Sequence, residues 1–217
     1  MLFSFKKIAL IVIAGAIFLF ASPKLNEASD LASGANIFMF PKPLGVSDMV
    51  LKNPFGKTVS LRDFKGKVVL LHFWSIQCPA CHIEEPQLDK VRRTFGPSGL
   101  EILGVNLVDQ PQAIVNHCAS NKPPFPVLFD GGGGFSLKAF NLGGKTTAFV
   151  VNARQEAILE VPGFPTTYIL DCRGDAVGFS VGAARWDHGS AVSLIQGLIA
   201  NRRTCFADLS RTFGNLF

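Results

Sequence analysis

The sequence predicts an α/β domain built on a central mixed sheet that is flanked by helices. The apolar run 68–74 has the composition of a buried central strand. Residues 79–95 have helical character, stop at four turn-forming residues and lead into an apolar strand over 100–108. A strand, a helix and a strand in this order favour parallel pairing, whereas a hairpin near the C-terminus adds antiparallel strands. The sheet is therefore expected to be mixed.

The other predicted elements follow in chain order. Alternation and turn residues from Val46 predict an N-terminal β extension, and the stretch 143–163 predicts an added β-hairpin. The whole domain is expected to span 43–217. The remaining predictions are a helix over 111–120, a strand over 127–129, a short helix near 135–142, a hairpin of 166–170 and 176–181, and a helix from about 190 to 201.

Composition places most of the unusual hydrophobicity at one end of the chain. The 217 residues are 48% apolar and 17% charged, with a net charge of +5. Of the first 21 residues, 17 are apolar, so the rest has an ordinary globular composition. These numbers exclude a polytopic membrane protein, a disordered chain and a strongly basic nucleic-acid binder.

The N-terminal segment has the layout of an export signal. Lys6 and Lys7 precede the 14-residue apolar run 8–21. Residues 1–22 are therefore expected to be a signal peptide or a membrane anchor, and 23–42 a linker. Export to a periplasmic or other extracytoplasmic compartment would permit disulfides among the five cysteines.

Two cysteines with the spacing of a redox pair stand at the start of the predicted helix 79–95. Cys78 and Cys81 are separated by Pro79 and Ala80. Thiols three residues apart on a helical turn can close a small disulfide, and a helix N-terminus favours a thiolate. Cys78 is thus expected to be the attacking nucleophile and Cys81 the resolving thiol. No metal or other cofactor is expected.

The segment 65–86, KGKVVLLHFWSIQCPACHIEEP, resembles the active-site region of thioredoxin-fold proteins, specifically the membrane-anchored ResA/TlpA-type thiol-disulfide oxidoreductases within the AhpC/TSA-redoxin-like superfamily. The resemblance runs from about 46 to 201, interrupted by 143–163. It implies a functional role for Glu84 beside the thiols, although an exposed helix charge is the plain alternative. It also implies a cis bond before Pro165, with Phe164 offered to an extended substrate.

The resemblance also implies partners and a direction of reaction. The expected substrates are protein disulfides in exported proteins, such as apocytochrome c, and the expected electron donor is a membrane protein. His72 stands where thioredoxin has a buried aspartate. It is expected either to relay a proton or to be a histidine satisfied within its strand. Gln77 and the Pro79-Ala80 pair depart from the best-known members of the fold.

The other cysteines and the alternative functions complete the predictions. A structural disulfide is expected between Cys172 and Cys205, and Cys118 is expected to be a buried core thiol. Residues 78–82 also match the Cys-x-x-Cys-His pattern of c-type haem attachment, so a haem-binding protein is one alternative. Residues 75–78 match the Ser-x-x-Cys pattern of peroxiredoxins, so a thiol peroxidase is another. A binding module that keeps only the fold is a further alternative.

Overall fold

The computed structural model describes residues 36–46, 49–129, 136–142, 145–152, 154 and 156–213. The predicted leader 1–22 and the first part of the linker lie outside these residues. The strands are β1 (Phe38–Gly45), β2 (Val50–Lys52), β3 (Thr58–Ser60), β4 (Val68–Phe73), β5 (Leu100–Asn106), β6 (Val127–Phe129), β7 (Ser136–Leu142), β8 (Lys145–Val151), β9 (Ala157–Val161), β10 (Thr166–Leu170) and β11 (Asp175–Val181). The helices are α2 (Pro79–Phe95), α3 (Pro111–Asn121) and α4 (Gly189–Phe213), with short 3₁₀ turns at Leu61–Phe64 and Gly96–Ser98.

The main sheet is mixed, as the sequence predicts. Its strand order is β1-β11-β10-β4-β5-β6-β2-β3. β4, β5 and β6 are parallel neighbours, while β10 and β11 pair antiparallel on the other side of β4. The central position of β4 matters for the site, because the chain passes from its end directly into Cys78 and α2.

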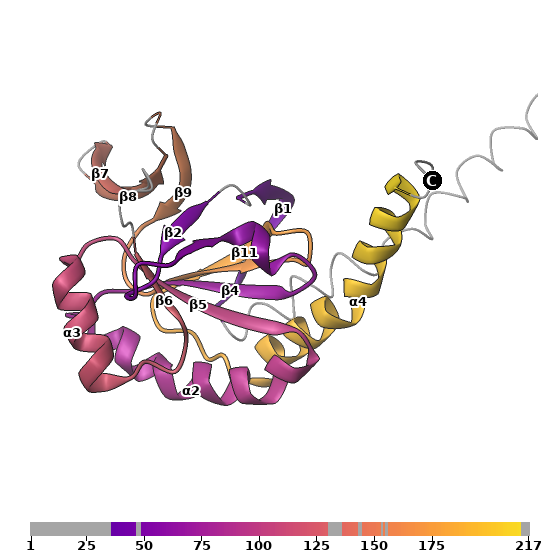
Figure 1. The fold of residues 1–217 in the computed structure, drawn as a ribbon, viewed down its shortest axis with the longest axis horizontal. Helices are drawn as coiled ribbons and strands as arrows, with labels where there is room; N and C mark the ends of the chain where they lie inside the picture. The colour runs from indigo at the N-terminus through magenta and orange to yellow at the C-terminus, as the bar shows by residue number, and fades with distance from the viewer. Residues whose placement is uncertain are drawn as a thin grey trace, which may run out of the picture.

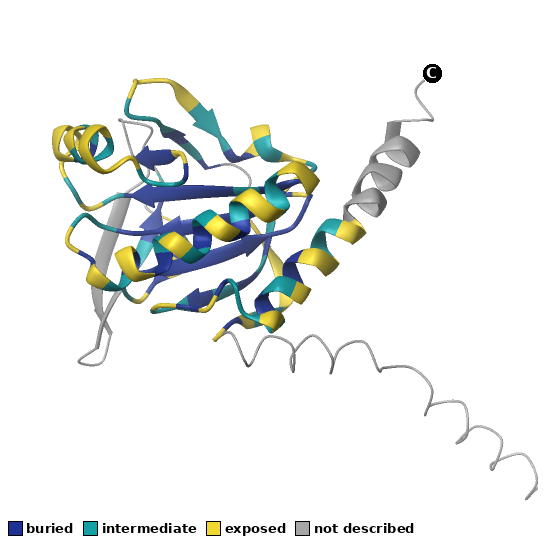
Figure 2. Ribbon diagram, turned by 90° about the horizontal axis from the view of Figure 1, so that it is seen from below, coloured by how far each residue is buried: buried dark blue, intermediate teal, exposed yellow. Residues whose placement is uncertain are grey.

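The two faces of β4 contribute to two separate hydrophobic clusters. Val68 and Leu70 pack with residues of α2 and α4, whereas Val69, Leu71 and Phe73 point to the opposite cluster. Figure 1 shows α2 and the beginning of α4 on one side of the sheet, and Figure 2 shows that the central strands are buried. Alternation along a strand therefore directs the even-numbered residues of β4 toward the helices.

The added segment forms a second sheet of strand order β7-β8-β9. Its β8 and β9 form the predicted antiparallel hairpin within 143–163. Val150, Leu159 and Val161 join the cluster on the side of the main sheet away from α2. The Tyr168 hydroxyl of β10 donates a 2.6 Å hydrogen bond to the Glu160 carbonyl. The second sheet thus packs against the face of the main sheet opposite α2.

The sequence-based predictions were wrong in three places. The sequence predicts a short helix near 135–142, but 136–142 form β7, because seven register pairs with β8 outweigh local propensity. The sequence predicts that 38–42 belong to the linker, but these residues lie in β1, which pairs with β11. The last helix continues to Phe213 instead of ending near 201. Within the described residues, no helix is long and apolar enough to cross a membrane.

Gly104 in β5 leaves the space that an aromatic ring of the core occupies. A Cβ atom at this position would lie 2.6 Å from Phe125 Cδ2 and 3.0 Å from Trp74 Nε1. We therefore expect Gly104→Ala to lower the free energy of unfolding by about 1–3 kcal/mol through overpacking. Urea denaturation would measure this loss. In a double-mutant cycle, Gly104→Ala should cost less stability when Phe125→Leu is also present, because leucine leaves more room for the new Cβ atom. Additive losses in that cycle would contradict the assigned clash.

Candidate active site

The two predicted cysteines form a disulfide at the N-terminus of α2. The Cys78 and Cys81 sulfurs are 1.99 Å apart, and their Cα atoms are 5.3 Å apart. Cys78 is the N-cap residue, and its sulfur accepts a 3.1 Å hydrogen bond from the Cys81 backbone N–H. Cys78 retains 7% of its surface exposed, whereas Cys81 is fully buried. Cys78 thus retains a small exposed surface, whereas Cys81 retains none.

The loop that leads into the dithiol is held by polar contacts that the sequence did not reveal. The Ile76 backbone N–H donates to Asp109 Oδ2 at 2.8 Å, and Asn106 Nδ2 donates to the same oxygen at 2.7 Å. His82 Nε2 lies 3.1 Å from the Ile76 carbonyl oxygen. These contacts tie the loop to the end of β5 and to the first turn of α2.

Glu84 is completely buried below the dithiol on α2, which excludes the exposed helix charge as its role. Its Oε1 accepts hydrogen bonds from the Ala184 N–H at 2.7 Å and from Trp186 Nε1 at 2.8 Å. Burial raises the pKa of Glu84 from 4.5 to about 7, although these two hydrogen bonds oppose the rise. The Glu84 carboxyl group can therefore gain and lose a proton near neutral pH.

His72 is completely buried on the helix-facing side of β4. Its Nδ1 lies 2.9 Å from Thr167 Oγ1 of β10 and 3.8 Å from Glu84 Oε2. Burial lowers the pKa of His72 from 6.5 to about 3, so the imidazole is neutral and does not form an ion pair with Glu84. The described residues offer no hydrogen-bond partner to His72 Nε2 or to Glu84 Oε2.

The Phe164–Pro165 peptide bond is cis, as the resemblance implied. β10 begins directly after it, and Thr166 pairs with Phe73, the last residue of β4. Because β4 leads into the dithiol, this register brings the cis-proline segment and the dithiol to the same end of the sheet. Phe164 is half-buried and Pro165 is buried.

The other cysteines are not part of the Cys78–Cys81 disulfide. Cys172 is disulfide-bonded, and its predicted partner Cys205 is within α4, at a position whose side chain lies outside the described residues. Their pairing stays a prediction. Cys118 is a free thiol that is half-buried, so it is less enclosed than the predicted core thiol, and burial raises its pKa.

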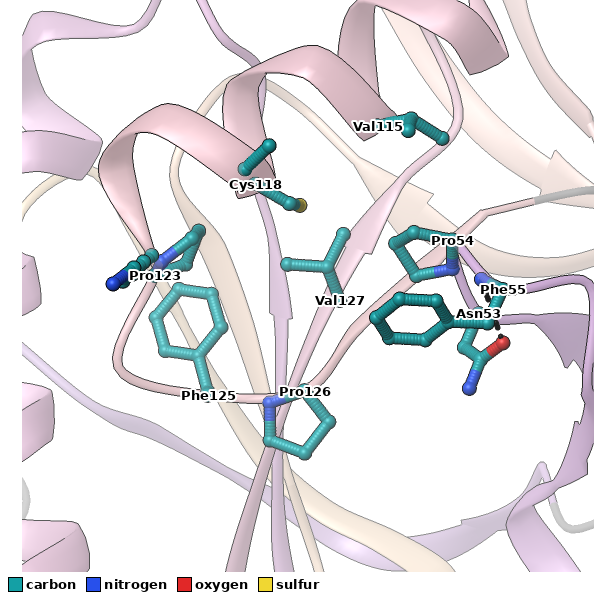
Figure 3. A pocket seen from close by; sticks show the side chains of 11 residues that line it. Asn53, Pro54, Phe55, Val115, Cys118, Pro123, Phe125, Pro126 and Val127 are labelled. Carbon is teal, nitrogen blue, oxygen red and sulfur yellow. Dashed lines mark hydrogen bonds between the residues drawn. The ribbon is translucent and has the colours of Figure 1, made fainter.

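A largely apolar cavity of about 400 Å³ lies beside α3 and β6. Figure 3 shows Cys118, Phe125 and Val127 among the side chains that line it, opposite Pro54 and Phe55. The Phe125 ring also contacts the rings of His72 and Trp74, with centroid distances of 5.4 and 6.5 Å. This ring therefore separates the cavity from the buried residues behind the dithiol.

A buried central strand, a dithiol at the following helix N-terminus and a cis-proline at the same end of the sheet together define a thioredoxin-fold protein with a cysteine pair able to form a disulfide. The polar residues behind the pair are Glu84 and His72. The chain belongs to the AhpC/TSA family, whose model matches residues 45–175.

The chain is similar to the thiol-disulfide oxidoreductase ResA of several bacilli. It is 32% identical to ResA of Bacillus subtilis over 123 residues, which are 57% of this chain and 68% of that protein. It is 30% identical to ResA of Bacillus thuringiensis subsp. konkukian over 116 residues, or 54% of this chain and 66% of that protein. The matched region thus spans just under two thirds of the Bacillus thuringiensis ResA chain.

Solved structures agree on the fold. A DsbF homologue from Corynebacterium diphtheriae has a TM-score of 0.55 and 20% identity, covering 83% of this chain and 99% of that one. A putative thiol:disulfide interchange protein DsbE from Chlorobium tepidum has a TM-score of 0.51 and 20% identity, covering 75% and 98%. At these identities, the likeness establishes the thioredoxin-like fold alone.

Proposed function

We propose that this chain is an extracytoplasmic thiol-disulfide oxidoreductase that reduces disulfides in exported proteins, including apocytochrome c. The disulfide between Cys78 and Cys81 at the N-terminus of α2 carries the proposal. The names of the ResA relatives support the reaction class, and the N-terminal apolar segment supports the compartment. A membrane protein that donates electrons would return the disulfide to its dithiol form.

The reaction is a two-step thiol-disulfide exchange. The Cys78 thiolate attacks one sulfur of the substrate disulfide, forms a mixed disulfide and releases one substrate thiolate, which takes up a proton. The Cys81 thiol then loses its proton and attacks the Cys78 sulfur, which releases the second substrate thiolate. Two electrons pass to the substrate, and the chain is left with the Cys78–Cys81 disulfide.

The unequal surroundings of the two sulfurs support this order. The exposed fraction of Cys78 is 7%, whereas that of Cys81 is zero, so Cys78 is the cysteine with a surface that a protein substrate can contact. The N-terminus of α2 and the Cys81 N–H, which donates to the Cys78 sulfur, both stabilise a thiolate there.

We assign proton handling for Cys81 to Glu84, which lies three residues further along α2. A carboxyl group with a pKa near 7 can accept a proton from a thiol and return it at neutral pH. His72 faces Glu84 Oε2 at 3.8 Å as a neutral imidazole, so it places no buried positive charge beside the carboxyl group.

Substrate recognition is assigned to Phe164 and Pro165. An extended substrate segment that lies beside Phe164 would place its disulfide next to Cys78, because both lie at the same end of the sheet. Haem attachment is disfavoured, since each sulfur of the motif is bonded to the other. The relatives' names favour disulfide exchange over peroxide reduction.

The reduction potential of the Cys78–Cys81 couple tests the proposed direction. The full-length chain is equilibrated in redox buffers, its free thiols are alkylated, and the reduced fraction is counted by mass spectrometry. We expect a value toward the thioredoxin end, about −270 mV, and a value near about −120 mV would reject the reducing direction. Cys118→Ser is the matched control, because it removes a thiol outside the dithiol and should leave the potential unchanged.

A further inference from the structure

The loop between β11 and α4 packs against the buried side of α2 at Glu84. Ala184 and Trp186 from this loop are 1% and 0% exposed. The Ala184 N–H and the Trp186 indole N–H both donate to the same oxygen, Glu84 Oε1, at 2.7 and 2.8 Å. Two donors on one oxygen hold the carboxyl plane in a fixed orientation.

This arrangement treats the two carboxyl oxygens differently. Oε1 accepts both hydrogen bonds, whereas Oε2 has no partner among the described residues and points toward His72 at 3.8 Å. Buried carboxyl oxygens are rarely left unpaired without a functional reason. The loop thus occupies one oxygen and keeps the second available inside the core.

A second contact joins the same loop to α2. Lys90 Nζ lies 3.1 Å from Asp187 Oδ2, with both side chains partly exposed. An exposed ion pair of this kind contributes little free energy, so the buried hydrogen bonds to Glu84 are the stronger link. Among the described residues, the titratable group that faces Glu84 is His72 from β4, while the Lys90–Asp187 pair lies at the edge of the loop.

We propose that Trp186 is a positioning residue for the redox centre, which holds Glu84 Oε1 so that Oε2 is the oxygen that exchanges protons. The proposal rests on the proton-handling role assigned to Glu84 above. An indole N–H donates to an ionised carboxylate more strongly than to a neutral acid. Trp186 therefore keeps the titration of a buried acid close to neutral pH, where disulfide exchange needs it.

The first test is the titration of Glu84 in the oxidised full-length chain, in which Cys78 and Cys81 have no protons to lose. Carbon NMR of the Glu84 carboxyl group, assigned by its disappearance in Glu84→Gln, gives the midpoint. We expect Trp186→Phe to move this midpoint upward by about one pH unit, since one hydrogen bond to the charged form is lost. An unchanged midpoint would overturn the proposal.

Trp74→Phe is the matched control. Trp74 is as buried as Trp186, but its indole N–H has no hydrogen-bond partner among the described residues. Its replacement should leave the Glu84 midpoint where it is. An equal shift in both variants would mean that the loss of an indole ring from the core, not the loss of the hydrogen bond, moves the titration, and this too would overturn the proposal.

A second measurement needs no tryptophan variant and so does not depend on Trp186→Phe folding. The sequence holds two tryptophans, so the chain has two indole N–H resonances. The Trp186 resonance should shift with the Glu84 midpoint and stop doing so in Glu84→Gln. A Trp186 resonance that does not shift with pH, or that still shifts with pH in Glu84→Gln, would refute the hydrogen bond between Trp186 and Glu84.

These readouts are independent of turnover, so the two proposals can fail separately. A Glu84 titration that follows Trp186 in a chain without disulfide exchange would refute the proposed function and leave the contact established. In an active chain, the pH profile of the exchange rate should shift in the same direction as the Glu84 midpoint in Trp186→Phe. An unshifted profile would refute the role of Trp186 in the reaction.

Discussion

Replacing Cys78 by serine is expected to abolish disulfide exchange, lowering the rate by at least about 10³-fold, because a serine hydroxyl cannot form the mixed disulfide. Cys78 is the cysteine that retains some exposed surface, and it lies at the N-terminus of α2. The effect is measured as the rate at which free thiols appear when the variant reduces a disulfide-bonded test protein. Turnover comparable to that of the unmodified chain would contradict the assignment of the nucleophile.

Two further cysteine variants separate the roles of the sulfurs. Cys81→Ser retains the nucleophile but removes the resolving thiol, so a mixed disulfide with the substrate should accumulate and be visible by mass spectrometry. Cys118→Ser removes a half-buried free thiol in the wall of the apolar cavity and should leave the rate unchanged. A mixed disulfide that accumulates in Cys78→Ser instead would reverse the assignment.

The second large effect is on stability and depends on pH. The pKa of Glu84 rises from 4.5 to about 7 on folding. Between these values the unfolded chain releases the proton while the folded chain retains it, so the free energy of unfolding falls as pH rises. Relative to Glu84→Gln, we expect the unmodified chain to lose about 3 kcal/mol of stability across this window. Urea denaturation of the oxidised proteins at several pH values measures the difference.

His72 contributes a slope of the opposite sign. Its pKa falls from 6.5 to about 3 on folding, so the unfolded chain takes up the proton first as pH drops. The stability that neutral His72 contributes is present above pH 6.5 and is lost as pH falls toward 3. The two slopes oppose each other between 4.5 and 6.5. A stability difference between the unmodified chain and Glu84→Gln that does not depend on pH would contradict the burial of an acid with a raised pKa.

The central elements could be predicted because local signals and topology agree there. The apolar run of β4 and the helix that starts at Pro79 and ends near Gly96 carry their own signals of period, composition and termination. The position of the dithiol follows from those boundaries, and a helix N-terminus favours the thiolate that its chemistry needs. β7 could not be predicted in the same way, since its partner β8 determines its conformation.

The contacts around Glu84 and His72 could not be predicted from local sequence patterns either. His72 and Thr167 meet because β10 pairs with β4 in one particular register, and a shift by one residue would separate them. Glu84 was found through its resemblance and spacing, but its donors Ala184 and Trp186 have no motif that links them to α2. Only tertiary packing reveals such a contact.

The distance along the chain between Glu84 and its donors has a consequence for biosynthesis. Ala184 and Trp186 lie 100 and 102 residues after Glu84, so they leave the ribosome well after the dithiol has been made. Domains fold as units while the chain emerges from its N-terminus. Until residue 186 is available, the Glu84 carboxyl group lacks the two hydrogen bonds that its Oε1 accepts in the complete domain. A chain that ends before residue 184 would therefore carry both cysteines of the pair without the donors that hold Glu84 Oε1.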